Sequence, residues 1–202
     1  MKKIPTLFKR VFDDNHRIKE VLNEVTPGCE WVLNGEGIAT EKLDGTCTLY
    51  KDGHIWKRYD AKHGKPIPEN AVPCQPEADP ITGHLPCWIP IDENNPSDKW
   101  FVKAYQEQLE RGYKFVEEQT YELCGIHFQG NPYALSHDFY YGHGFEKINN
   151  VPRDYTGIKE YLRTHYIEGL VFHRGNGEMC KIKRTDFGFP WNDKRGELNE
   201  RS

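Results

Sequence analysis

Residues 38–50 read IATEKLDGTCTLY, and a single lysine, Lys42, interrupts what otherwise has the composition of β-strands. Asp-Gly at 44–45 is a pair typical of tight turns. The segment KDGH at 51–54 is a second turn signal, and IWKRYD follows it. We therefore expect three strands here, with Lys42 in the loop between the first two. A lysine in that place is either a solvated turn residue or a nucleophile. The other motifs of the sequence distinguish these two readings.

Size and composition set the first limits. The chain has 202 residues, 37% hydrophobic and 13% aromatic, which indicates one ordered domain with short extensions. Its net charge of -4 argues against coating nucleic acid by bulk attraction but permits a local basic groove. No apolar run approaches the roughly 20 residues of a membrane span. We expect an intracellular, cytoplasmic protein without a membrane anchor.

The six cysteines contain no Cys-x-x-Cys pair. We expect buried free thiols rather than a disulfide framework or a zinc knuckle. Cys74, His84 and Cys87 form the only loose cluster of metal-ligand type, and their spacing is poor. The cysteines are Cys29, Cys47, Cys74, Cys87, Cys124 and Cys180.

Three helices are expected from apolar spacing. The first runs from about Leu7 to Val25, ahead of Pro27-Gly28. The second covers about residues 98–111 and ends at Gly112. The third covers about residues 156–164, with Thr156 as its cap.

Proline marks residues 64–98, which hold eight of the thirteen prolines. This pattern predicts a mostly irregular excursion of the kind that often serves as a functional lid, not a central strand. The next segment, YKFVEEQTYELCGI, returns to strand composition.

The clearest hairpin lies near the end: IEGLVFHR, the turn Gly-Asn-Gly, then EMCKIKR. Period-two alternation places Lys181 and Lys183 on one face of the last strand, and Cys180 and Ile182 on the other. Two ammonium groups on one face indicate either an exposed surface or an anion between them.

The order of charged residues is more specific than any one of them. KLDG at 42–45 is followed by Arg58, Glu122, Glu168 and the lysine pair of KIK. In order and strand context, this resembles the motifs of covalent nucleotidyltransferases, which include ATP-dependent ligases and capping enzymes. TEKLDGTC, GHLPCWIP, GNPYAL, IEGLVFH, KIKR and FGFPW bring the chain closer to one family. They are similar to small ATP-dependent 5′-to-3′ RNA ligases that include a vertebrate RNA repair ligase.

That resemblance covers about residues 38–191 and implies an α+β nucleotidyltransferase fold, with antiparallel sheets around an ATP cleft and flanking helices. It divides the chain into an N-terminal extension (1–35), packed on the main domain, a nucleotidyltransferase domain (36–195) and a polar tail (196–202). No appended oligonucleotide-binding domain is expected, so RNA contacts fall to this domain itself. Basic candidates for them are Lys147, Arg153, Lys159, Arg163, Arg174, Arg184, Lys194 and Arg195.

The resemblance also implies the reaction. Lys42 attacks ATP to form lysyl-AMP, AMP passes to an RNA 5′-phosphate, and a 3′-hydroxyl then seals the strand and releases AMP. Mg²⁺ or Mn²⁺ is required, and no protein partner is inferred. Lys181 and Lys183 stabilise charge on the α-phosphate.

The carboxylates and Arg58 take supporting roles under the same resemblance. Glu122 accepts hydrogen bonds from ribose hydroxyls, and Glu168 holds the metal directly or through water. Arg58 contacts the sugar or the incoming 5′-phosphate, and Glu41 helps to select adenine. Two alternatives remain open: a capping-type enzyme that transfers GMP from GTP, and a non-catalytic RNA-binding module with the same fold.

Overall fold

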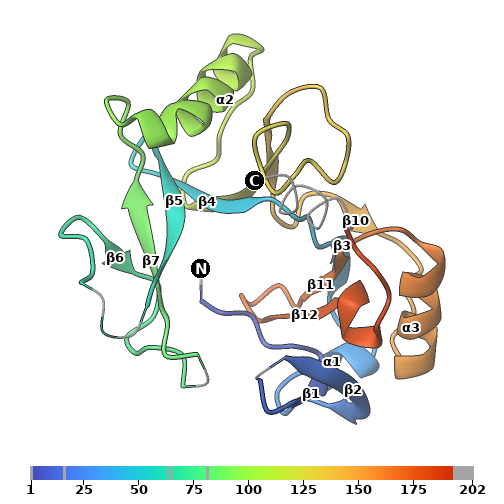
Figure 1. Cartoon of the computed structure of the whole chain (residues 1–202). Coiled ribbons are helices and arrows are strands. Elements are labelled where there is room, and N and C mark those ends of the chain that lie inside the picture. The colour runs from blue at the N-terminus through green and yellow to red at the C-terminus, as the bar shows by residue number, and fades with distance from the viewer. Residues whose placement is uncertain (1, 16, 63, 65, 81, 193–202) are drawn as a thin grey trace, which may run out of the picture. The chain divides into compact units, whose positions relative to one another are not determined.

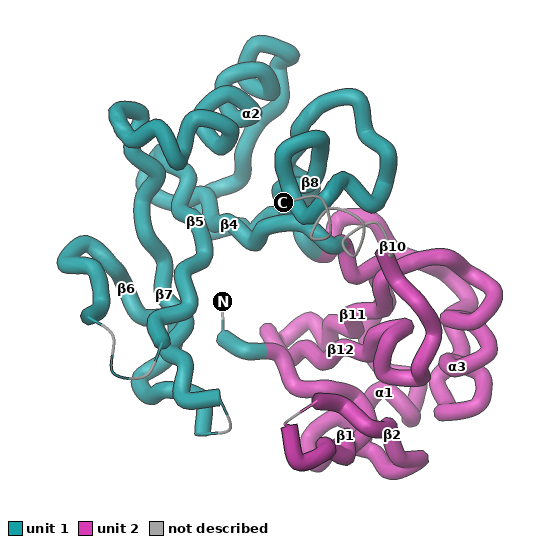
Figure 2. The backbone as a smooth tube through the Cα atoms, in the orientation of Figure 1, with its two compact units in different colours: residues 1–3, 44–143 teal, residues 4–43, 144–202 magenta. Residues whose placement is uncertain are grey.

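The computed structural model describes residues 2–15, 17–62, 64, 66–80 and 82–192 (Figure 1). The chain forms two compact units, coloured separately in Figure 2. Unit 1 contains residues 1–3 and 44–143, and unit 2 contains residues 4–43 and 144–202. The chain therefore passes from unit 2 to unit 1 immediately after Lys42-Leu43 and returns after His143. The predicted tail 196–202 lies outside the described residues.

Unit 1 is built on a six-stranded antiparallel sheet with the order β6-β7-β5-β4-β8-β9. One face packs against α2 in a core that includes Ile55, Ala104, Tyr121 and Tyr140. The elements are β4 (Thr46–Lys51), β5 (His54–Ala61), β6 (Val72–Pro73), β7 (Leu85–Pro90), η1 (Pro96–Asp98), α2 (Lys99–Glu110), β8 (Gln119–Cys124) and β9 (Phe139–Gly142).

Unit 2 contains a four-stranded antiparallel sheet with the order β10-β3-β11-β12, and a separate two-stranded sheet of β1 and β2. Ile158 and Leu162 of α3 are fully buried in the same core as Leu170 and Ile182. The elements are β1 (Phe8–Phe12), β2 (Ile18–Val25), α1 (Glu30–Leu33), β3 (Ile38–Glu41), β10 (Lys147–Ile148), α3 (Tyr155–Thr164), β11 (Gly169–His173), β12 (Met179–Lys183) and η2 (Arg184–Phe187).

The strands around Lys42 are confirmed: β3, β4 and β5 cover the predicted segments, and Lys42 follows β3 directly. Gly45 is required by close packing, because a Cβ atom there would collide with the carbonyl group of Leu123. The C-terminal hairpin is confirmed as β11 and β12, with Val171 opposite Lys181 and Gly169 opposite Lys183. The sequence therefore placed these strands correctly because their signals are local.

The predicted N-terminal helix is wrong, because residues 8–12 and 18–25 form the antiparallel strands β1 and β2. Asp13 makes the turn: its Oδ1 atom accepts hydrogen bonds from the backbone N–H groups of Asn15 and Arg17. The preceding residues pair with β12, since the Leu7 N–H donates to the Lys181 carbonyl at 2.7 Å. Tertiary pairing thus outweighs the apolar spacing that suggested a helix.

The described residues between 64 and 98 are mostly irregular, as expected, but β7 lies between β5 and β6 inside the sheet, which was not expected. Its two prolines lack an N–H donor, but the Pro86 carbonyl still accepts from the Cys74 N–H at 2.8 Å. Helix α2 is confirmed, although Leu109 is exposed and Gln108 is buried in its place. Helix α3 is confirmed with a different cap: Asp154, not Thr156, accepts from the Gly157 N–H.

All six cysteines are free thiols, and four of them are buried, as expected. Within the described part of the chain, no helix is both long enough and apolar enough to cross a membrane.

Candidate active site

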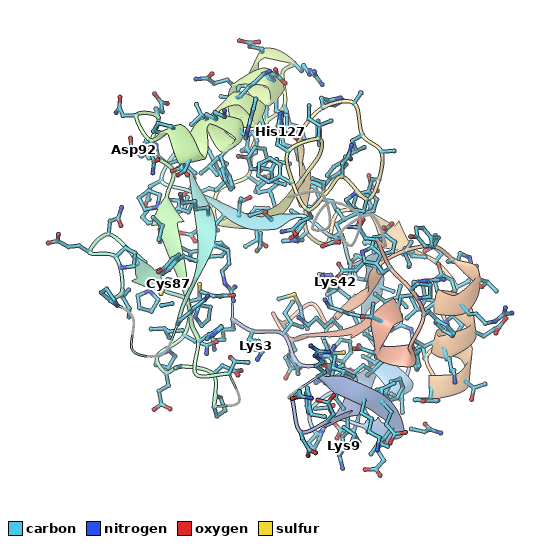
Figure 3. All side chains as sticks on the ribbon, in the orientation of Figure 1. Lys3, Lys9, Lys42, Cys87, Asp92 and His127 are labelled. Carbon is cyan, nitrogen blue, oxygen red and sulfur yellow. The ribbon has the colours of Figure 1, made fainter. Side chains whose placement is uncertain are left out.

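Lys42 is held at the end of β3, and Figure 3 labels its side chain. Its backbone N–H donates to the Gly169 carbonyl at 2.9 Å, which continues the pairing of β3 with β11 by one residue. Its Nζ atom donates to Glu168 Oε2 at 2.6 Å. Glu168 comes directly before β11, and its side chain is only 5% exposed. The strand pairing thus brings two residues 126 positions apart into contact.

The second oxygen of Glu168 binds another predicted residue. Lys183 Nζ lies 2.9 Å from Glu168 Oε1, so one buried carboxylate bridges two ammonium groups. Gly169 allows this approach, because a Cβ atom there would collide with the carbonyl group of Ile182 on β12. The structure therefore brings Lys42, Glu168 and Lys183 together.

Lys181 lies on the same face of β12 as Lys183, while Cys180 and Ile182 between them are fully buried in the core. Burial, followed by the positive charges of Lys42, Lys183 and Arg10, lowers the pKa of Lys181 to about 8. The predicted alternation of this strand is confirmed. Its polar face concentrates more positive than negative charge, which suits an anionic group.

Arg10 on β1 joins this cluster and was missed in the sequence. It forms an ion pair with Asp186, whose side chain is fully buried, at 2.7 Å. Asp186 Oδ2 also accepts from the Lys183 N–H at 2.8 Å, so the pair fixes the backbone where β12 ends. No sequence signal identified Arg10, because the segment was read as a helix far from the last strand.

Glu41 neighbours Lys42 in sequence but faces the opposite side of β3 by the alternation of the strand. It pairs with Leu170 of β11, and its charge acts on Tyr161 of α3. Burial, with smaller contributions from Glu146 and Glu168, raises the pKa of Glu41 above its ordinary value. Its assignment to adenine selection stays a prediction.

Unit 1 carries the other predicted residues. Glu122 on β8 is 9% exposed, and its Oε1 atom accepts from the Gly45 N–H at 3.0 Å. Its Oε2 atom lies 3.0 Å from His143 Nε2, and His143 Nδ1 lies 3.0 Å from Thr120 Oγ1. Both carboxylate oxygens thus have partners within unit 1. His143 was missed because it follows β9 in a loop without a motif.

Cys47 and Arg58 occupy the same face of this sheet as Glu122. Cys47 lies opposite Glu122 in the register of β4 with β8. Thr48 lies opposite Lys57 on β5, so the next pair along is Cys47 with Arg58. Burial, followed by the charge of Glu122, raises the pKa of the Cys47 thiol to about 12. Arg58 Nε donates to Asp60 Oδ1 at 2.8 Å.

The arginines predicted to grip RNA are engaged within unit 2. Arg153 donates to the carbonyl groups of Glu36 and Gly37. Arg163 pairs with Glu160, and Arg174 pairs with Glu36 and Glu178. Arg184 is buried and donates to the carbonyl groups of Leu162, His165 and Pro190. Arg184 supports the fold through its buried hydrogen bonds, whereas Arg163 and Arg174 form exposed ion pairs. Lys194 and Arg195 lie outside the described residues.

The cluster in unit 2 suits an anion with more than one negative charge. Three ammonium groups belong to it, and Glu168 neutralises only one of them in full. Glu168 is also a hard oxygen donor of the type that Mg²⁺ and Mn²⁺ prefer. Each of its oxygens accepts one hydrogen bond from a lysine here and keeps a second lone pair.

Comparison with known proteins places the chain in a family. Residues 64–202 match the family model described as RNA ligase 1. The curated proteins named RNA ligase 1 from Pongo abelii and Rattus norvegicus are each 28% identical to the chain. The protein of that name from Danio rerio is 27% identical. Each alignment covers 76% of this chain and 68% of the relative.

These matches define the chain as a ligase of the RNA-joining class. It belongs to the RNA ligase 1 family. The sequence resemblance to RNA ligases is thereby confirmed.

Proposed function

We propose that this protein seals RNA strands through ATP-dependent covalent nucleotidyl transfer, with Lys42 as the nucleophile. The observation that carries the proposal is the bridge of Glu168 between Lys42 and Lys183. A buried carboxylate fixes the position of the lysine amine and holds a second cation beside it. Family membership supports RNA as the substrate class.

The first step needs an aligned amine and a stabilised phosphate. The bond between Lys42 Nζ and the α-phosphorus of ATP forms while the bond to the bridging oxygen of pyrophosphate breaks. The Lys42 ammonium loses one proton to become the attacking amine, and Glu168 Oε2, hydrogen-bonded to Nζ at 2.6 Å, is the proposed acceptor. A second proton leaves to solvent as the nitrogen–phosphorus bond forms. Lys183 and Lys181, on the same strand face, offset the negative charge that builds on the phosphate oxygens. Preorganised cations of this kind stabilise the transition state of phosphoryl transfer.

Mg²⁺ or Mn²⁺ bound with ATP supplies further positive charge at the phosphates, and Glu168 is the protein ligand proposed for it. Glu122 and Arg58 keep the roles expected from the sequence, Glu122 at ribose hydroxyls and Arg58 at the sugar or the RNA phosphate. AMP then passes to an RNA 5′-phosphate, and a 3′-hydroxyl displaces it.

Mass spectrometry of the full chain given ATP and Mg²⁺ tests the proposal. We expect the mass to rise by one AMP unit, with Lys42 as the modified residue after peptide mapping. We expect labelled GTP, given in place of ATP, to leave the protein unlabelled. A label from GTP alone would favour a capping-type enzyme. No label from either nucleotide would favour an RNA-binding module.

A further inference from the structure

Unit 1 gathers three side chains of metal-ligand type on one face of its sheet. They are Cys47 of β4, Glu122 of β8 and His143, which follows β9. One potential ligand atom of each lies within 4.8 Å of those of the other two. The strands β4, β8 and β9 are neighbours in the sheet, so this arrangement is fixed by strand register.

The donor types indicate which ion the cluster would select. Sulfur, imidazole nitrogen and carboxylate oxygen together are the ligand set of Zn²⁺ and similar borderline-soft ions, whereas Mg²⁺ prefers oxygen alone. Ligand atoms around a tetrahedral Zn²⁺ are separated by about 3.5 Å, so side-chain adjustments of about 1 Å would complete the site. Three protein ligands with one open position are common at zinc sites that exchange a ligand.

The surroundings of the cluster also match those of metal sites. His143 Nδ1 lies 3.0 Å from Thr120 Oγ1, an outer contact that orients the ring and turns Nε2 towards Glu122 Oε2. A bound ion would replace the direct contact between Nε2 and Oε2. Glu122 Oε1 is held by the Gly45 N–H, which leaves Oε2 on the side of His143. An ion bound to Cys47 Sγ would take the place of the thiol proton.

We propose that Cys47, Glu122 and His143 form a binding site for Zn²⁺ or a similar borderline-soft divalent ion, which inhibits the enzyme by withholding Glu122 from the nucleotide. The inhibitory part rests on the proposed function, in which Glu122 binds ribose. Binding of the ion itself does not depend on that function. An intracellular rise in such an ion would then switch ligation off without any change in ATP or Mg²⁺.

Titration of the full chain with Co²⁺, without nucleotide and with a phosphine reductant, tests the site directly. Co²⁺ bound to a thiolate gives an intense near-ultraviolet charge-transfer band. We expect this band in the wild type and not in Cys47→Ser. His143→Gln should weaken Co²⁺ binding by at least about tenfold. Cys74→Ser is the matched control, since its sulfur is not in the cluster.

The metal site would be overturned by absence of the band in the wild type, by its persistence in Cys47→Ser, or by its loss in Cys74→Ser.

A second measurement follows binding of a fluorescent ATP analogue, with each protein compared with and without Zn²⁺. We expect Zn²⁺ to weaken binding of the analogue at least about tenfold in the wild type, because Glu122 no longer binds ribose, and little in Cys47→Ser. Unchanged nucleotide affinity in metal-loaded wild type would overturn the inhibitory role. Failure to bind nucleotide under any condition would count against the proposed function, while the Co²⁺ result would still decide the site.

Discussion

The Nζ atom of Lys42 lies 2.6 Å from Oε2 of Glu168, a residue 126 positions later in the chain. The pairing of β3 with β11 fixes this contact, because the Lys42 N–H binds the carbonyl group of Gly169. Lys42 therefore has a defined orientation that a residue in a solvated turn would not have. The interpretation of Lys42 as a nucleophile rests on this relationship, and it can be tested through each neighbour.

Lys42→Ala and Lys42→Arg should both abolish formation of protein–AMP. Alanine has no amine, and the arginine guanidinium keeps its proton and cannot attack phosphorus. Intact mass measured after incubation with ATP and Mg²⁺ gives the result, and thermal unfolding shows whether the variants fold. Lys9→Ala, on the exposed part of β1, is the control and should be labelled like the wild type. AMP found on another lysine would rule out the assignment.

Glu168 and Glu122 should differ in their dependence on metal. Alanine at either position should slow adenylylation strongly, but only Glu168→Ala should change the Mg²⁺ concentration needed for half-maximal rate. Glu168 is the proposed metal ligand, whereas Glu122 is assigned to ribose. The measurement is the rate of protein–AMP formation across a Mg²⁺ titration. Identical titration curves for the wild type and Glu168→Ala would rule out Glu168 as a metal ligand.

The alternation of β12 predicts opposite effects for adjacent residues. Lys183→Ala or Lys181→Ala should slow adenylylation by about 10² to 10³, since each removes a cation from the phosphate. Ile182→Ala should instead lower the free energy of unfolding by roughly 2 to 5 kcal/mol, because its side chain is fully buried. The adenylylation rate per folded molecule tests the lysine variants, and urea unfolding measures the stability of Ile182→Ala. Full rate in both lysine variants would remove them from the phosphate site.

Lys181 should make stability depend on pH. Its pKa is about 8 in the folded protein, lowered from 10.5 mainly by burial. Between these values the unfolded chain binds more protons, so the contribution of Lys181 to the free energy of unfolding rises with pH. Below about pH 8 both states are protonated and the contribution is constant at its least favourable value.

Lys181→Met isolates this effect from the other titrating groups. Relative to the wild type, the variant should be more stable at about pH 7, and its advantage should shrink towards about pH 10. Urea unfolding of both proteins at the two pH values provides the comparison. A constant difference between them would mean that Lys181 is not desolvated in the folded state.

Arg10 and Lys9 offer a matched test on one strand. Arg10 pairs with a fully buried carboxylate, Asp186, whereas Lys9 pairs with the exposed Glu24. Arg10→Ala should lower the free energy of unfolding by roughly 3 to 5 kcal/mol, because it leaves the buried Asp186 carboxylate without its charged partner. Lys9→Ala should cost less than about 1 kcal/mol. Urea unfolding of both variants measures these losses. Equal losses of stability would show that Arg10 does not stabilise Asp186.

Local signals in the sequence determined much of the candidate site. Lys42 could be placed between strands because a tight-turn pair follows it, and the faces of Lys181 and Ile182 followed from alternation alone. Helices α2 and α3 were visible from their apolar spacing. Each of these features depends on residues close together in the chain, so the sequence alone was sufficient for them.

Only the tertiary structure decided which distant residues meet. Apolar spacing near Leu7 fits a helix, but pairing with β12 and the turn at Asp13 make strands instead. Arg10 joins the lysine cluster only as a result of that pairing. His143 reaches Glu122 because β9 lies beside β8, an adjacency that no local pattern encodes. Strand pairing and the neutralisation of buried charge are long-range interactions, and their outcome depends on the folded chain as a whole.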